Sequence, residues 1–274
     1  MHHWGLDPSP GCAEAARRLY GIPVLTTSLS GLAQSHEKFD FLIMIGVLEH
    51  IRDLDGALVT LHKVLFPEGR VHLEVPDATQ FADWPDAPFQ QFSTEHINFF
   101  SGRSLANLMQ VHGFRCGSSE KIQRSYTDTT VMPCVQAVFE NSPEAQAAWL
   151  KDDETEARLL DYIRQSEAVD SRLRQIIERT AAIGRPIIVW GVGTHTQRLL
   201  ADGGLDRADI CLFVDSNPKY HGHELRGVPI VSPESLKQRA EPILICSRVF
   251  QREIQGQIRD QLRLNNELLL LYDI

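Results

Sequence analysis

A glutamate and a histidine stand side by side at Glu95 and His96, inside the aromatic segment 92–101 that precedes an expected helix. An imidazole beside a carboxylate, partly shielded from water, is suited to remove a proton near neutral pH. Segment 92–101 follows the acidic, proline-rich loop 77–88 and precedes a helix, which is where a lid over the substrate is expected in an alternating strand and helix fold. The pair predicts a general base, and the alternative is a buried loop histidine that only hydrogen-bonds the backbone.

Four other residues stand at the ends of expected strands. Asp7 ends a short strand that begins at residue 3, and Ile45, Gly46 and Val47 end the apolar strand 39–46. Ligands of open α/β sheets bind outside the carboxyl ends of the strands, where an acidic residue commonly accepts a hydrogen bond from a ribose hydroxyl. We therefore expect these four residues to bind the nucleoside part of a cofactor. Asp7 has an alternative role as the cap of the helix that follows it.

Gly191 and Gly193 form a G-x-G turn between an apolar strand and a helix, and Asp215, Asn217 and Lys219 follow the next expected strand. Backbone amides in such a turn approach an anion at the start of the helix. These five residues predict a binding site for an anionic substrate. The alternative is that the glycines only make a tight strand-to-helix turn.

The same turn matches the dinucleotide fingerprint incompletely, because Thr196 stands where the third glycine belongs. Arg198, in the helix that follows, is a second source of positive charge beside Lys219. No catalytic pair follows the turn in the sequence, which disfavours an NAD-dependent oxidoreductase.

The alternation of strands and helices predicts an α/β protein with two Rossmann-like, doubly wound parallel-sheet domains. Residues 1–140 form the first domain, which lacks its opening strand, and residues 185–274 form the second. Residues 141–184 are polar with apolar residues spaced by three and four, which is typical of a helix and predicts a helical connector. This connector could pack against either domain or against a second copy of itself.

Composition excludes several classes of protein. The chain has 274 residues and a net charge of −9, with no basic stripe for nucleic acid. Its five cysteines are far apart, so neither a disulfide framework nor a metal site is expected, and a cytoplasmic location is the simpler interpretation. The longest apolar run, Phe41 to Leu48, is much shorter than the roughly 20 residues that span a bilayer.

The runs 39–51 and 65–76 contain Ile45-Gly46-Val47, the Leu48-Glu49-His50 sequence and a Pro-x-Gly turn before a second strand. They resemble the fourth strand, turn, helix and fifth strand of class I methyltransferases that use S-adenosylmethionine. The resemblance covers about residues 4–115 and implies this cofactor, with Asp7 and Ile45 to Val47 at its nucleoside. By spacing alone, Glu49 and His50 are as readily capping and packing residues as ligand contacts.

Segment 92–101 resembles the Glu-His motif of sugar C-methyltransferases. That resemblance implies that His96 removes a proton next to a sugar ketone, with Glu95 as its partner or as an acceptor for a substrate hydroxyl. The tyrosine that the family has two residues before the glutamate is replaced by Ser93. Residues 189–234 resemble the Rossmann-like C-terminal domain of the same enzymes, which implies that Gly191 to Lys219 hold a nucleotide-linked sugar.

The family's first strand and its glycine loop, which holds the methionine end of the cofactor, have no counterpart in this sequence. We therefore expect S-adenosylmethionine to bind weakly, if at all. We also expect the strands 3–6 and 39–46 either to pair directly or to be covered in a homodimer.

The sequence thus predicts a methyltransferase, with C-methylation of a nucleotide-linked keto-sugar or related carbohydrate as the reaction. The alternative is a non-catalytic protein that binds a nucleotide sugar or another anion through its C-terminal domain. Whether this chain is an active enzyme stays open at this point.

Overall fold

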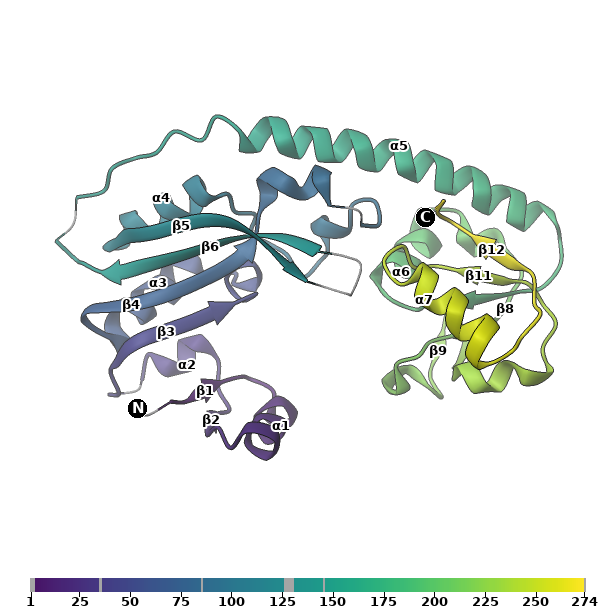
Figure 1. The fold of residues 1–274 in the computed structure, drawn as a ribbon, viewed down its shortest axis with the longest axis horizontal. Helices are drawn as coiled ribbons and strands as arrows, with labels where there is room; N and C mark the ends of the chain where they lie inside the picture. Colours follow the sequence, from purple (N-terminus) through teal and green to yellow (C-terminus); the bar gives the residue numbers. More distant parts are fainter. Residues whose placement is uncertain (1–2, 35, 85, 126–130, 145, 274) are drawn as a thin grey trace. The chain divides into compact units, whose positions relative to one another are not determined.

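The protein forms two compact units in a computed structural model that describes residues 3–34, 36–84, 86–125, 131–144 and 146–273 (Figure 1). Unit 1 comprises residues 1–79, 94–124 and 132–155, and unit 2 comprises residues 80–93, 125–131 and 156–274. Both combine sheets with helices, which confirms the predicted α/β class. The units are not consecutive in sequence, because residues 80–93 belong with the C-terminal part of the chain.

The main sheet of unit 1 has four strands in the order β3-β4-β6-β5. Their bounds are β3 Phe39–Ile45, β4 Leu65–Pro76, β5 Phe114–Ser125 and β6 Val131–Asn141. β3 and β4 are parallel, whereas β4 and β6 are antiparallel, so the sheet is mixed. The two parallel strands are those that the apolar runs predict.

Helices α3 (Leu54–Val64) and α4 (Gly102–Val111) supply buried apolar faces to the core of this unit. The Asp53 carboxylate caps α3 by accepting from the Gly56 N–H, and Ser101 with Ser104 forms a capping box at the start of α4. Short 3-10 turns lie at η1 (Leu48–His50), η2 (Ala78–Asp83) and η3 (Gln90–Phe92); residues 80–83 of η2 and the whole of η3 belong to unit 2.

The N-terminal residues form a separate pair of parallel strands, β1 (Gly5–Leu6) and β2 (Val24–Leu25), joined by α1 (Pro10–Tyr20). β1 does not pair with β3, so the prediction of direct pairing is wrong. A strand, helix and parallel strand that follow one another form a local unit, and this unit already supplies the ladder partner of β1. The short helix α2 (Leu29–Leu32) then packs against α3.

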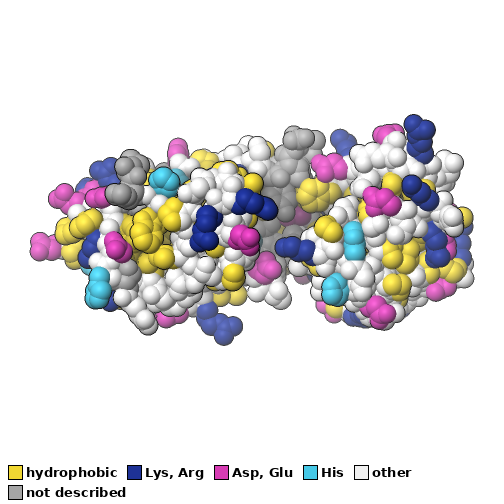
Figure 2. All heavy atoms as spheres, turned by 90° about the horizontal axis from the view of Figure 1, so that it is seen from below, with side chains coloured by type: hydrophobic (Ala, Val, Ile, Leu, Met, Phe, Trp, Pro, Cys, Tyr) yellow, Lys and Arg dark blue, Asp and Glu magenta, His cyan; other side chains and the backbone are white. Residues whose placement is uncertain are grey.

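β3 is consequently an edge strand of its sheet, and one of its faces is exposed. Phe41 is 50% exposed, Ile43 63% and Ile45 46%. Figure 2 shows patches of hydrophobic side chains on the surface of this unit. The homodimer that would cover this edge stays a prediction.

Unit 2 contains a six-stranded sheet in the order β12-β11-β7-β8-β10-β9. Its strands are β7 Ile187–Trp190, β8 Ile210–Val214, β9 Glu224–Leu225, β10 Val228–Val231, β11 Ile243–Ile245 and β12 Leu268–Leu270. All neighbours are parallel except β9 and β10. The strand order reverses at β7, which is the topological switch point of a doubly wound sheet.

The helices of unit 2 are α5 (Thr155–Ala182), α6 (Thr194–Ala201) and α7 (Gln251–Gly256), and the last continues into a π turn over Gln257–Gln261. Three 3-10 turns complete the unit, at Leu205–Arg207, Pro218–Tyr220 and Pro233–Gln238. The predicted connector helix is α5, and its Leu173 and Ile177 lie in the same core as Val189 of β7. The connector therefore packs in the C-terminal unit.

Residues 80–93 dock on α5 through backbone donors. The Phe89 N–H donates to Ser166 Oγ at 3.1 Å, and the Gln91 N–H donates to Tyr162 Oη at 3.0 Å. The Phe81 and Phe92 rings meet the Tyr162 ring edge-on, with centroids 5.7 and 5.2 Å away. Residues just before the Glu-His pair are thus held by α5.

The surface carries both signs of charge. On the face drawn in Figure 2, basic and acidic side chains of the described residues are interspersed without an extended basic surface, which agrees with the net charge of −9. Among the described residues, no helix is both long and apolar enough to cross a membrane.

Candidate functional site

The chain turns sharply where β3 ends. Gly46 has a φ of +64°, a conformation that suits glycine, and its N–H donates to the Glu74 carbonyl of β4 at 3.0 Å. The turn η1 follows and buries Leu48 and Glu49 while leaving His50 partly exposed. The Leu-Glu-His sequence is therefore held at the carboxyl end of a parallel strand, where ligands of α/β folds bind.

Segment 94–98 is fastened to this turn by its backbone and by one amide. The N–H groups of Ile97 and Asn98 both donate to the Glu49 carbonyl, at 3.0 and 3.1 Å. The Asn98 Nδ2 donates to the carbonyls of Leu48 at 3.2 Å and Ile51 at 2.7 Å. Two segments that lie far apart in sequence thus form one piece of structure.

This fastening brings two histidines together. The His50 and His96 rings have centroids 5.0 Å apart and are tilted by 58°. His50 Nδ1 lies 2.8 Å from the Glu95 carbonyl oxygen, so Nδ1 carries the hydrogen, and in the neutral ring Nε2 is the acceptor. The pairing of His96 with a histidine from the strand-end turn was not predicted from the sequence.

The carboxylate of Glu49 lies close to these two rings. Its Oε1 lies 3.8 Å from His50 Nε2, and one ligand atom from each of Glu49, His50 and His96 lies within 4.8 Å of the others. The Glu95 side chain is exposed, and the contact it makes with His50 is through its backbone carbonyl. Burial, more than any other effect, raises the pKa of Glu49 above its usual value.

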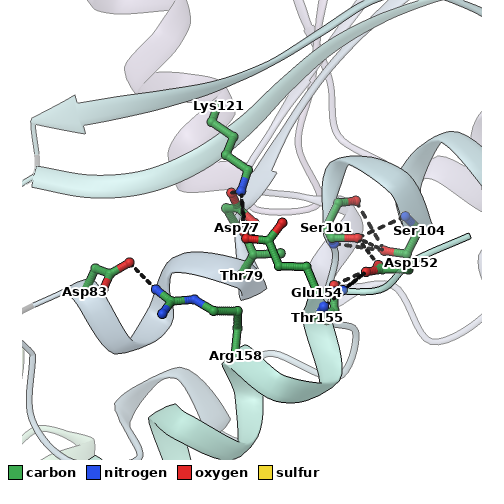
Figure 3. Close-up of polar contacts among 10 residues, drawn as sticks. All are labelled: Asp77, Thr79, Asp83, Ser101, Ser104, Lys121, Asp152, Glu154, Thr155 and Arg158. Carbon is green, nitrogen blue, oxygen red and sulfur yellow. Dashed lines mark hydrogen bonds and ion pairs between the residues drawn. The ribbon is translucent and has the colours of Figure 1, made fainter.

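Glu74 of β4 and Asp77, which follows β4, are buried acids with partners of their own. Both oxygens of Glu74 accept from the guanidinium of Arg124 on β5. Asp77, fully buried, accepts from the Thr79 N–H and hydroxyl and lies 3.9 Å from Lys121 Nζ (Figure 3). The Cys134 thiol stays protonated, because burial raises its pKa to about 12.

Figure 3 also shows how the start of α4 is tied to the residues before α5. The Asp152 carboxylate accepts from the hydroxyls of Ser101 and Thr155. These hydrogen bonds lower the pKa of Asp152 to about 2, although its burial acts in the opposite direction. The contact stabilises the helix that follows the Glu-His segment.

Asp7 lies where the sequence places it, at the end of β1. Its Oδ1 accepts from the Ser9 N–H at 2.7 Å, and Ser9, not Asp7, is the N-cap of α1. Asp7 Oδ2 has no hydrogen-bond partner among the described residues. At the end of β3, Ile45 and Val47 are 46% and 38% exposed, so their apolar side chains are available to a ligand.

Unit 2 contains a cavity of about 640 Å³ at the carboxyl ends of β7 and β11, the strands on either side of its switch point. Its walls include the predicted residues Gly191, Gly193, Asp215 and Asn217. Lys219 is exposed and is not part of the wall. The volume is in the range of small-molecule sites.

The predicted polar residues shape the wall of this cavity. Asp215 Oδ2 accepts from the Val192 N–H at 3.0 Å and its Oδ1 accepts from the Asn217 N–H at 2.8 Å. Gly191 has a φ of +102°, and a Cβ at Gly193 would meet nothing within 4 Å. The G-x-G turn therefore leaves backbone open toward the cavity at the start of α6.

Arg248, which the sequence analysis did not single out, supplies a positive charge to the wall of the cavity. Its NH1 donates to the Asp86 carbonyl at 2.8 Å, and its guanidinium lies 5.5 Å from the Tyr272 ring centroid. Arg198, by contrast, is bound to Asp170 of α5. A charged residue directly after a strand at the switch point is the sequence signal that could have identified Arg248.

Two parts of the chain match families of known proteins. Residues 2–119 match a family described as "Methyltransferase domain", and residues 184–268 match one described as "C2185-like, N-terminal". "C-methyltransferase NovU" of Streptomyces niveus is 27% identical over 241 residues, which are 84% of this chain and 57% of that protein. "Uncharacterized 37.1 kDa protein in transposon TN4556" of Streptomyces fradiae is 27% identical over 58% of this chain and 49% of its own length. The chain thus spans about half the length of these relatives.

Solved methyltransferase structures resemble about half of the chain. The 1,6-didemethyltoxoflavin-N1-methyltransferase of Burkholderia thailandensis is 20% identical, with a TM-score of 0.38, and the match covers 50% of this chain and 60% of that one. The N-methyltransferase NodS of Bradyrhizobium japonicum is 17% identical, with a TM-score of 0.35 and coverage of 50% and 71%. Such TM-scores add no argument about the reaction. The match over residues 2–119, the strand-end turn and its Leu-Glu-His sequence make the N-terminal part of the chain similar to S-adenosylmethionine-dependent methyltransferases of class I.

Proposed function

We propose that this protein transfers a methyl group from S-adenosylmethionine to a carbon of a nucleotide-linked keto-sugar, with His96 as the general base. The observation that carries the proposal is the fastening of segment 94–98 to the turn after β3, which holds His96 5.0 Å from His50 beside the expected cofactor residues. The match to a relative named as a C-methyltransferase over 84% of the chain supports the same reaction.

The residues at the ends of β1 and β3 fit the nucleoside end of the cofactor. Asp7 has a carboxylate oxygen to accept from ribose hydroxyls, and Ile45 and Val47 offer exposed apolar surface beside the backbone of Gly46. When bound, the cofactor supplies an electrophilic methyl group. The task of the protein is to produce the carbanion that takes it.

His96 would perform that task by accepting the proton of the C–H bond next to the sugar ketone. Transfer to a carbon needs such a base, since a C–H bond gives up its proton far less readily than an N–H or O–H group. A positioned general base typically accelerates such a step by 10²–10⁴-fold. The Ser93 that replaces the family tyrosine leaves this step to the imidazole.

The cavity of unit 2 is our candidate for the nucleotide part of the substrate. The open backbone after Gly191 and the guanidinium of Arg248 suit phosphate oxygens, and Asp215 suits a ribose hydroxyl. The same cavity supports the second candidate, a protein that binds a nucleotide sugar without catalysis. The two differ in whether a bound keto-sugar loses its proton.

Exchange of hydrogen for deuterium at the carbon next to the ketone tests the base without requiring the cofactor. In D₂O, nucleotide-linked keto-sugars should exchange in the presence of the wild-type chain, and His96→Ala should slow exchange about 10²-fold or more. His50→Ala should slow exchange less than His96→Ala does. Methyl transfer from labelled S-adenosylmethionine to the same panel then identifies the reaction.

Two results would contradict the proposal. Full exchange by His96→Ala would show that His96 is not the base. Methylation of oxygen or nitrogen would show that the reaction is not C-methylation. Nucleotide-sugar binding by calorimetry with neither exchange nor transfer would favour the binding protein.

A further inference from the structure

The carboxylate that accompanies the two histidines is more deeply buried than either ring. Glu49 is 3% exposed, its Oε1 lies 3.8 Å from His50 Nε2, and its Oε2 has no hydrogen-bond partner among the described residues. A buried carboxylate in this state is costly unless a positive charge lies close by. Its surroundings therefore decide what it does.

The basic side chains of β5 are already bound to other acids. Arg124 is bound to Glu74, and Lys121 contacts Asp77, Thr79 and Glu154. Burial has the largest effect on the pKa of Glu49 and raises it; a backbone hydrogen bond and then the charge of His50 lower the pKa, and Glu74 raises it by the smallest effect. Cys134 carries no charge at neutral pH, and the Glu95 carboxylate points into solvent. Within the described residues, the imidazoles are left to balance Glu49.

We infer that Glu49 is the positioning residue of the proposed base: its carboxylate orients the His50–His96 pair and stabilises the positive charge that His96 gains with a substrate proton. The inference rests on the proposed function for its catalytic part. Its electrostatic part concerns the free protein, because the three side chains lie together without a substrate.

The main chain and the side chain of Glu49 make different contacts in this cluster. Its carbonyl accepts from the N–H groups of Ile97 and Asn98, which fixes the backbone next to His96. Its side chain lies on the Nε2 side of His50, whose Nδ1 is turned to the Glu95 carbonyl. One residue thus sets both the place of His96 and the charge beside it.

A histidine NMR titration of the free protein tests the electrostatic part. In Glu49→Gln, where shape is kept and charge is lost, His96 should take up its proton at lower pH than in the wild type, because an anion beside an imidazole favours its charged form. In Glu49→Asp, which keeps the negative charge, His96 should take up its proton at a pH close to that of the wild type. Glu178→Gln, on an exposed face of α5, is the matched control and should leave the titration unchanged.

Deuterium exchange at the keto-sugar tests the catalytic part. Glu49→Gln should slow exchange about 10-fold, with little change in KM, and should move the acid limb of the pH–rate profile to lower pH, since the base then protonates less readily. If Glu49→Gln is unfolded by circular dichroism, the comparison of Glu49→Asp with the wild type decides. An unchanged His96 titration and an unchanged pH profile would overturn the inference.

The outcomes separate this inference from the proposed function. If Glu49→Gln shifts the His96 titration but the wild type catalyses no exchange, the electrostatic role of Glu49 is supported and the proposed reaction is contradicted. The same three side chains are also possible ligands for a divalent metal ion. Exchange that a chelator abolishes and Zn²⁺ restores would overturn proton handling by this cluster.

Discussion

A buried histidine of unit 2, His195, lies at the start of α6. It is 8% exposed, its Nε2 hydrogen-bonds Tyr272 Oη at 2.8 Å, and its Nδ1 has no partner among the described residues. Burial, assisted by the charge of Arg198, lowers the pKa of His195 from 6.5 to about 4. The folded protein therefore holds this imidazole neutral.

His195 should make unit 2 sensitive to mild acid. Between about pH 6.5 and 4 the unfolded chain binds a proton at His195 that the folded chain does not, so stability is present above this window and falls as the pH is lowered through it. The loss should reach about 3 kcal/mol near pH 4. The free energy of unfolding of His195→Gln should depend less on pH than that of the wild type.

Tryptophan fluorescence offers a readout for this unit. Trp84 and Trp190 of unit 2 are 9% and 2% exposed, whereas Trp4 and Trp149 of unit 1 are 49% and 76% exposed. His223→Gln, at an exposed position, is the control and should behave as the wild type. Equal pH dependence of the wild type and His195→Gln would contradict the buried neutral state.

At the scale of single residues, the sequence predicts which residues line a site better than it predicts which residues they contact. Gly191 and Asp215 could be located from a turn and its spacing, and both line the cavity of unit 2. Lys219 is close to them in sequence but is exposed, in the 3-10 turn that Asn217 caps. Arg248 reaches the cavity from another strand end, and this neighbourhood exists only once β7 and β11 pair.

At the scale of elements, the Asn98 amide adds side-chain hydrogen bonds between two stretches of chain that backbone hydrogen bonds to the Glu49 carbonyl already join. Replacing it by alanine would remove the donor to the carbonyls of Leu48 and Ile51. Asn98→Ala should lower the free energy of unfolding of unit 1 by about 1–3 kcal/mol, because partly buried carbonyls lose their partner. The same variant should slow any exchange catalysed through His96.

Urea unfolding followed by circular dichroism checks the stability of Asn98→Ala, with exchange rates measured in parallel. Asn265→Ala, at an exposed position of unit 2, serves as the control. If Asn98→Ala equals this control in both measurements, the amide does not hold the segment.

The sequence predicts some strands of unit 1 and not others. β3 was predicted from an apolar run, and the second half of β4 was predicted from residues 70–76, which follow the Pro-x-Gly turn. β5 was missed, since it is a polar strand at the outer edge of the sheet with few buried residues. β6 was missed as well, because an antiparallel partner of β4 follows no strand and helix alternation.

At the scale of the whole molecule, the exposed face and open edge of β3 predict association between two copies. Unpaired strand edges with apolar side chains are templates for pairing with another chain. Light scattering should find a dimer at micromolar concentration, and Ile43→Lys, at a site 63% exposed, should shift it toward monomer without unfolding the protein. A wild-type monomer would contradict this prediction.

The order of the units along the chain sets an order in time. Residues 80–93 leave the ribosome long before α5, since their hydrogen-bond partners Tyr162 and Ser166 lie 71 and 77 positions later. At synthesis rates of 5–20 residues per second this delay lasts roughly 4–15 s. During that interval, Phe81 and Phe92 have no Tyr162 ring to pack on. A nascent chain therefore carries this segment exposed while translation continues, and a pause in elongation before α5 lengthens its exposure to chaperones and proteases.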